Sequence, residues 1–131
     1  MLDPTTSEPQ PLPANLGGDL GVALSHPRPG VAVLAVRGEI DALTTPQLET
    51  GIDELLADPA ERVVLDLTQV TFLASSGLAV LIRAAQLAGE RAQRLRLVVA
   101  TRAVRRPLQV TGSDQLFDLF DDLGAAIGDP V

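Results

Sequence analysis

Two adjacent serines, Ser75 and Ser76, have the position in this sequence that best suits chemistry. They precede Gly77 at the start of an apolar pattern with helical spacing, so they fall at the N-terminus of a predicted helix. A helix N-terminus offers unpaired N–H groups and a partial positive charge, and it tolerates a phosphate on a serine. Gly77 has no Cβ and would let another backbone approach closely. Alternatively, the serines simply cap the helix.

The rest of the composition argues against catalysis by this chain. It contains no Cys, Lys, Trp or Tyr, and its one histidine is His26. These absences exclude thiolate-bound metals, disulfides, Schiff-base chemistry and a phosphate-binding lysine. A nucleophilic Ser75 would depend on His26, which lies in a distant predicted hairpin, and no G-x-S-x-G motif is present. We therefore predict that the protein is not an enzyme.

The charge distribution bears on the partners. A formal net charge of −7 disfavours nucleic acids and anionic membranes. Residues 83–106 nevertheless carry seven arginines and one glutamate, which indicates either a partner-facing surface or a solvated face. No leader peptide or membrane-length apolar run is visible, so we expect a cytoplasmic protein. Four prolines in the first 13 residues predict a flexible tail over residues 1–18, followed by one domain over residues 19–131.

Apolar patterning predicts alternating strands and helices. Strands are expected at residues 20–25, 31–37, 62–67, 95–100 and 116–120. A turn is expected at 26–30 and a loop at 68–74, and helices are expected at 45–58, 75–89, 101–110 and 121–127. This β-β-α-β-α-β-α-β-α order predicts an α/β fold, with a mixed, mostly parallel sheet of about five strands and helices chiefly on one face.

Several single residues receive structural interpretations. Thr44 or Thr45 is expected to cap the first helix, with Pro46 in its first turn, and Thr101 to cap the third. Gly112 is expected to end the third helix. We place His26 in a solvated turn and Asp66 at a strand end. The three phenylalanines are expected in the core, and they are Phe72, Phe117 and Phe120.

The segment VLDLTQVTFLASSGLAVL (residues 64–81) resembles the signature of STAS domains, and most closely that of bacterial anti-sigma factor antagonists. Three other segments match the family in the same order. They are GEID (38–41), the Gly89-Glu90 pair after the long helix, and VTGSDQLFDLF (110–120). The resemblance extends over about residues 19–128.

This resemblance implies a partner-switching regulator. Such a protein binds an anti-sigma factor, usually a GHKL-type serine kinase, and so releases a sigma factor. The kinase would phosphorylate Ser75, or alternatively Ser76, and a PP2C-type phosphatase would reverse the modification. ATP and magnesium would belong to the kinase, so this chain needs no cofactor or metal, and a monomer or weak homodimer is expected. The implied partner-contact residues are Glu39, Asp41, Thr44, Ala74, Ser75, Ser76, Gly77 and Leu78.

The sequence departs from the family pattern at Ala74, where aspartate is usual. An aspartate there could cap the helix or orient the neighbouring hydroxyl, and alanine does neither. Three alternatives follow. In the first, Ser75 is still phosphorylated. In the second, the protein binds its partner constitutively. In the third, it is a non-switching STAS subunit of a transporter or signalling complex and uses the same surface.

Overall fold

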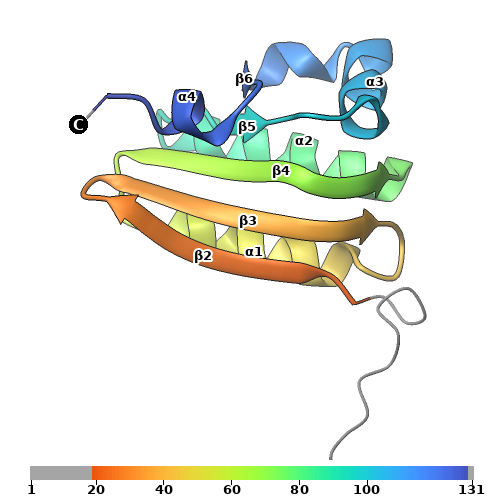
Figure 1. The fold of residues 1–131 in the computed structure, drawn as a ribbon, viewed down its shortest axis with the longest axis horizontal. Helices are drawn as coiled ribbons and strands as arrows, with labels where there is room; N and C mark the ends of the chain where they lie inside the picture. Colours follow the sequence, from red (N-terminus) through yellow and green to blue (C-terminus); the bar gives the residue numbers. More distant parts are fainter. Residues whose placement is uncertain (1–18, 130–131) are drawn as a thin grey trace, which may run out of the picture.

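A five-stranded sheet organises the computed structural model, which describes residues 19–129. Its strands lie side by side in chain order (Figure 1). They are β2 (Gly21–Arg28), β3 (Val31–Ile40), β4 (Arg62–Leu73), β5 (Arg96–Val98) and β6 (Asp118–Phe120). β2 runs antiparallel to β3 and the other neighbours are parallel, so the predicted mixed, mostly parallel sheet is confirmed. The tail predicted over residues 1–18 lies outside the described residues.

Four α-helices connect and cover the strands. They are α1 (Thr45–Ala57), α2 (Ser75–Glu90), α3 (Arg102–Thr111) and α4 (Leu123–Ile127), with a short 3-10 helix, η2 (Ser113–Leu116), before β6. α1 and α2 lie behind the sheet in Figure 1, whereas α4 lies on the near face. The predicted element order is therefore confirmed, and η2 is an addition to it.

Aliphatic side chains fill the space between the sheet and its helices. Leu34, Leu65 and Leu97 lie in register on three neighbouring strands, and all three are fully buried in the larger core cluster with α1, α2 and α3. A smaller cluster of valines lies under Ala126 of α4 on the other face. Because the middle strands are covered on both faces near their amino ends, their sequences are apolar without alternation.

β4 is longer than its apolar run suggests. The prediction of a loop at residues 68–74 is wrong, because β4 continues to Leu73 and pairs with the end of β3. Two register shifts interrupt this pairing and obscure the alternation in the sequence. Val70 and Leu73 are nevertheless buried in the larger core. Asp66 consequently lies inside the strand, not at its end, and its Oδ1 accepts a hydrogen bond from the Thr68 N–H at 3.0 Å.

The first hairpin also differs from its prediction. β2 reaches Arg28 across a register shift, so the turn predicted at 26–30 is reduced to Pro29 and Gly30. Gly30 has a φ of +83°, which glycine adopts without strain. His26 therefore lies in a strand and not in a turn. Its Nε2 lies 2.6 Å from Oδ2 of Asp58, which follows the C-terminus of α1.

The C-terminal half has the predicted elements, but several of their bounds differ. Gly112 ends α3 with a φ of +75°, as expected. Thr101 stands at the N-cap position of α3, but its side chain makes no capping hydrogen bond. The predicted strands at 95–100 and 116–120 are shortened to β5 and β6, and Leu116 belongs to η2. The predicted helix at 121–127 begins two residues later, and Asp122 caps it by accepting a hydrogen bond from the Ala125 N–H at 2.8 Å.

Three arginines bind the C-terminal end of α4. Arg28 from β2 donates to the Gly128 carbonyl at 2.9 Å, and Arg96 from β5 donates to that of Ala126 at 2.9 Å. Arg62 from β4 donates to the carbonyls of Ile127 and Asp129. The last carbonyls of a helix lack intrahelical partners, and cations favour that end of the helix dipole. Of the arginine-rich stretch 83–106, Arg96 thus has a structural role in this contact.

The His26–Asp58 contact makes a testable contribution to stability. Hydrogen bonds from His26 and from the Ala60 N–H hold the pKa of Asp58 below its usual value of 3.8. Ionised Asp58 therefore stabilises the folded state above pH 3.8, and this contribution disappears as the pH falls through the lower folded-state pKa. We expect Asp58→Asn to lower the free energy of unfolding at pH 6, and the deficit to shrink on acidification.

Urea denaturation of both proteins at a series of pH values measures this difference. Glu54→Gln, which neutralises an exposed carboxylate on α1, controls for the change in net charge. A deficit for Asp58→Asn that stays constant from pH 6 to about pH 2.5 would contradict the assignment.

Candidate functional site

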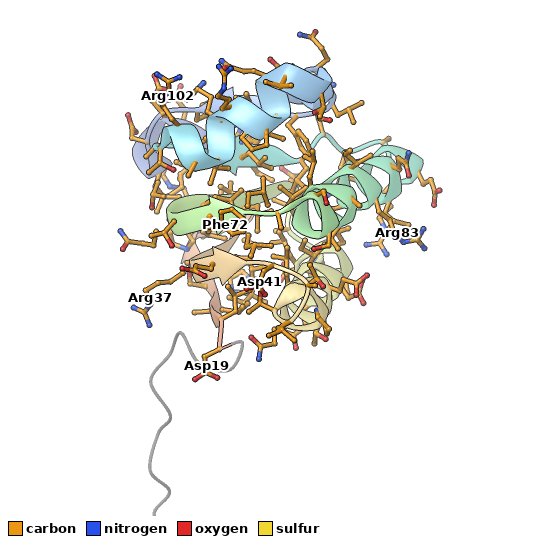
Figure 2. All side chains as sticks on the ribbon, turned by 90° about the vertical axis from the view of Figure 1, so that its right-hand side faces the viewer. Asp19, Arg37, Asp41, Phe72, Arg83 and Arg102 are labelled. Atoms are coloured by element: carbon orange, nitrogen blue, oxygen red, sulfur yellow. The ribbon has the colours of Figure 1, made fainter. Side chains whose placement is uncertain are left out.

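The predicted site residues converge at one edge of the sheet, where β3 and β4 end and α1 and α2 begin. The Ala74 N–H donates to the carbonyl of Ile40 at 2.8 Å, which joins the two strand ends. Figure 2 looks onto this edge and shows Phe72 and Asp41 near its centre. Two segments that are distant in the sequence, 39–44 and 72–78, thus lie at the same edge of the sheet.

The loop between β3 and α1 is held by its own side chains. Oδ1 of Asp41 accepts hydrogen bonds from the N–H groups of Leu43 at 2.9 Å and Thr44 at 3.0 Å. The Thr44 hydroxyl donates to the Glu39 carbonyl at 2.8 Å and accepts from the Asp41 N–H at 2.9 Å. Thr44 is only 2% exposed. The loop therefore has a defined conformation that presents its acidic residues at the edge.

Thr44 does not act as the expected helix cap. It occupies the N-cap position of α1, and Pro46 lies in the first turn as predicted, but the Thr44 side chain makes no capping hydrogen bond. Its hydroxyl is already engaged by the loop. Since its side chain is buried, Thr44 positions the loop and is not itself exposed to a partner.

The start of α2 agrees with the sequence prediction. α2 begins at Ser75, and Ala74 occupies the N-cap position with extended backbone angles and no side-chain cap. Ser75 is exposed and Ser76 is half-buried. No hydrogen bond of either hydroxyl is present within residues 19–129. The N–H groups of the first turn thus keep their donor capacity, and the Ser75 hydroxyl is accessible from solvent.

Gly77 and Leu78 form the buried side of this helix start. A Cβ added to Gly77 would lie 2.2 Å from Cγ2 of Ile40 and 2.9 Å from Cδ1 of Leu73. The close approach expected at Gly77 is therefore made by the side chains of Ile40 and Leu73. Leu78 is buried in the larger core. By packing on the core, Gly77 and Leu78 anchor the helix turn that carries Ser75.

Phe72 is the functional candidate that the sequence reasoning missed. It was expected in the core, but it is 47% exposed. Its partner in the sheet register is the exposed Glu39. The register shift between Gly38 and Glu39 adds one residue to β4 after Val70, and Phe72 consequently lies outside the core cluster that holds Val70. The only signal in the sequence was the three-residue spacing from Val70 to Leu73, which departs from strand alternation.

The surface around Ser75 is thus partly apolar and partly acidic. Leu43, in the loop between β3 and α1, is 72% exposed. With Phe72, Glu39, Asp41 and Ser75 it forms what we call the switch edge. Exposed large apolar side chains near a defined polar group are typical of a protein-binding surface.

Two further properties concern metals and membranes. Within residues 19–129, no group of three histidine, aspartate or glutamate side chains is placed to hold a metal ion. In the same range, no helix combines the length and the apolar character that crossing a bilayer requires.

The close packing at Gly77 yields a prediction about the site. Gly77→Ala would force its new methyl group into Ile40 and Leu73, so we expect a loss of about 1–3 kcal/mol of stability. Gly89→Ala is the matched control on the same helix, because its Cβ would meet nothing within 4 Å. We expect that control to be neutral or to stabilise α2 by up to about 1 kcal/mol.

Thermal and urea unfolding compare the two variants directly. Equal stabilities for Gly77→Ala and Gly89→Ala would show that the contact between α2 and the end of β3 tolerates a methyl group.

The sequence of the chain is similar to that of known proteins. The family model described as STAS domain matches residues 25–126. The anti-sigma-F factor antagonist RsfB of Mycobacterium tuberculosis is 39% identical over 98 residues, which cover 75% of this chain and 80% of the relative. The anti-sigma F factor antagonist of Paenibacillus polymyxa is 26% identical over 105 residues, covering 79% of this chain and 89% of the relative.

Solved structures give the same result. The crystal structure of an anti-sigma factor antagonist from Mycobacterium paratuberculosis superposes with a TM-score of 0.77 at 34% sequence identity. The match covers 86% of this chain and 97% of the other. The anti-sigma factor antagonist SpoIIAA in its unphosphorylated form shares the fold, with a TM-score of 0.60 at 17% identity.

Proposed function

The chain belongs to the STAS domain family, among the anti-sigma factor antagonists, and we propose that it binds an anti-sigma factor through the switch edge. Binding would withdraw the anti-sigma factor from a sigma factor and so release the latter for transcription. The observation that carries the proposal is the exposed Ser75 at the first residue of α2, at the same sheet edge as the exposed Phe72 and Leu43. A role of this kind needs no catalytic group of this chain and takes place in the cytoplasm.

We further propose that phosphorylation of Ser75 controls binding. The anti-sigma factor would be a GHKL-type serine kinase that supplies ATP and magnesium, and a PP2C-type phosphatase would remove the phosphate. Ser75 is favoured over Ser76 because it is the more exposed of the two. At the N-terminus of α2 a phosphate faces N–H groups that no side chain caps, so it does not disturb the helix.

The effect of the phosphate is then local to the docking surface. It adds about 1.5 to 2 negative charges at neutral pH, next to the strand end that carries Glu39 and Asp41. A partner that covers this edge must remove water from the phosphate, which costs free energy without any refolding of the domain. Alanine at position 74 fits this view, because the first-turn N–H groups remain available to the phosphate.

A phosphorylation assay tests the switch. The protein is incubated with ATP, magnesium and each purified GHKL-type kinase of the same organism, and the products are mapped by mass spectrometry. We expect one phosphate on Ser75 and none in Ser75→Ala. Ser75→Asp should weaken anti-sigma factor binding at least about tenfold. Ser25→Asp should leave binding unchanged. It adds the same charge at an exposed serine of β2 that pairs with Val33, near the opposite end of β3 from the switch edge.

Other outcomes select between the alternatives. Binding without any phosphate on Ser75 or Ser76 would indicate a constitutive antagonist and end the switch proposal. No binding to any GHKL-type kinase, with recovery of a transporter subunit instead, would favour a STAS accessory subunit.

The apolar part of the switch edge gives a separate prediction. Phe72→Ala should weaken anti-sigma factor binding by at least about fivefold, because an exposed aromatic side chain that a partner buries often contributes much of the binding energy. Leu116→Ala is the control, since Leu116 is 41% exposed but lies on η2, near the C-terminal end of α2. Isothermal titration calorimetry measures both affinities, and equal values for the two variants would contradict a contact at Phe72.

A further inference from the structure

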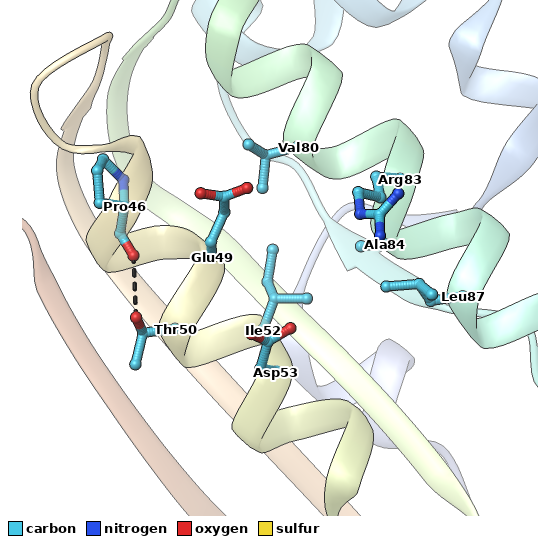
Figure 3. A pocket seen from close by; sticks show the side chains of 9 residues that line it. All are labelled: Pro46, Glu49, Thr50, Ile52, Asp53, Val80, Arg83, Ala84 and Leu87. Carbon is cyan, nitrogen blue, oxygen red and sulfur yellow. Dashed lines mark hydrogen bonds between the residues drawn. The ribbon is translucent and has the colours of Figure 1, made fainter.

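A groove separates α1 from α2 and contains charged groups that the proposed switch does not use (Figure 3). Its volume is about 430 Å³. α1 contributes Glu49 and Asp53, and α2 contributes Val80, Arg83 and Leu87. We propose that this groove binds a basic, amphipathic segment of the anti-sigma factor. The proposal rests on the function proposed above, and it adds a second contact region to it.

The charge of α1 indicates the chemistry of the bound segment. Thr45–Ala57 contains three acidic residues and no basic one. Glu49 and Asp53 are one helical turn apart, so their carboxylates lie on the same face of α1. Figure 3 shows the Glu49 carboxylate in the space between the helices, facing Val80.

Both carboxylates are available to a partner. Within the described part of the chain, neither Glu49 nor Asp53 takes part in a hydrogen bond or an ion pair. Arg83 stands on the opposite wall but is not within ion-pair distance of either. Two unpaired carboxylates one turn apart match lysine or arginine side chains with the same spacing on a helix.

The apolar lining indicates that the segment is amphipathic. Val80 and Leu87 are half-buried along α2, and Ile52 and Ala84 beneath them are buried. A helix that places apolar side chains in a groove and basic ones at its rim satisfies both kinds of group. A purely polar ligand would leave this apolar surface without a partner.

The position of the groove connects it to the switch edge. It begins at Pro46, in the first turn of α1 after the Asp41 loop, and Val80 lies about one turn beyond Ser76 on α2. A partner that covers Ser75 can therefore extend into the groove along the two helices. Contacts there would select among anti-sigma factors independently of the phosphate.

Charge reversal on α1 tests the proposal with a matched pair. Glu49→Lys changes a residue that lines the groove, and Glu54→Lys makes the same change at an exposed position of α1 outside it. We expect Glu49→Lys to weaken binding of the purified GHKL-type anti-sigma factor about tenfold at low salt, and Glu54→Lys less than twofold. The difference should shrink as ionic strength rises.

Leu87→Ala tests the apolar lining and should weaken binding even at high salt. Circular dichroism melts confirm that each variant is folded. Equal affinities for Glu49→Lys and Glu54→Lys would overturn the groove proposal alone, provided that Phe72→Ala still weakens binding. If the unmodified protein binds no anti-sigma factor, both the proposed function and the groove proposal fail.

Discussion

The contact between the start of α2 and the end of β3 is the constraint on which the switch edge depends. One backbone hydrogen bond joins Ala74 to Ile40, and the absence of a Cβ at Gly77 lets Ile40 pack directly against the helix. This hydrogen bond and this close packing together fix the position of the start of α2, and therefore of Ser75, relative to the end of β3. Without this approach, the loop that carries Asp41 and the helix that carries Ser75 would not share a surface.

At this edge, the residues that hold the backbone in place differ from those that are exposed to a partner. Thr44, Gly77 and Leu78 are buried and define the geometry, whereas Glu39, Phe72 and Ser75 are exposed. A covalent change at Ser75 therefore alters what the surface presents and leaves the support intact. This division would suit the regulation by modification of Ser75 that is proposed above.

The sequence predicts those features that depend on local chemistry. The start of α2 at Ser75 and the end of α3 at Gly112 follow from apolar spacing and from the left-handed backbone of glycine. Features that depend on pairing between distant strands were not predictable. The extension of β4 and the exposure of Phe72 result from register shifts against β3, whose only trace in the sequence is the three-residue spacing from Val70 to Leu73.

The three arginines beneath α4 have a consequence for the order of folding. They come from β2, β4 and β5, yet their acceptors are carbonyls of residues 126–129, which follow all five strands in the sequence. During synthesis these guanidinium groups emerge long before their acceptors. Until residues 126–129 have been made, the three guanidinium groups lack their native acceptors, so α4 can cover this sheet face only after that segment is available.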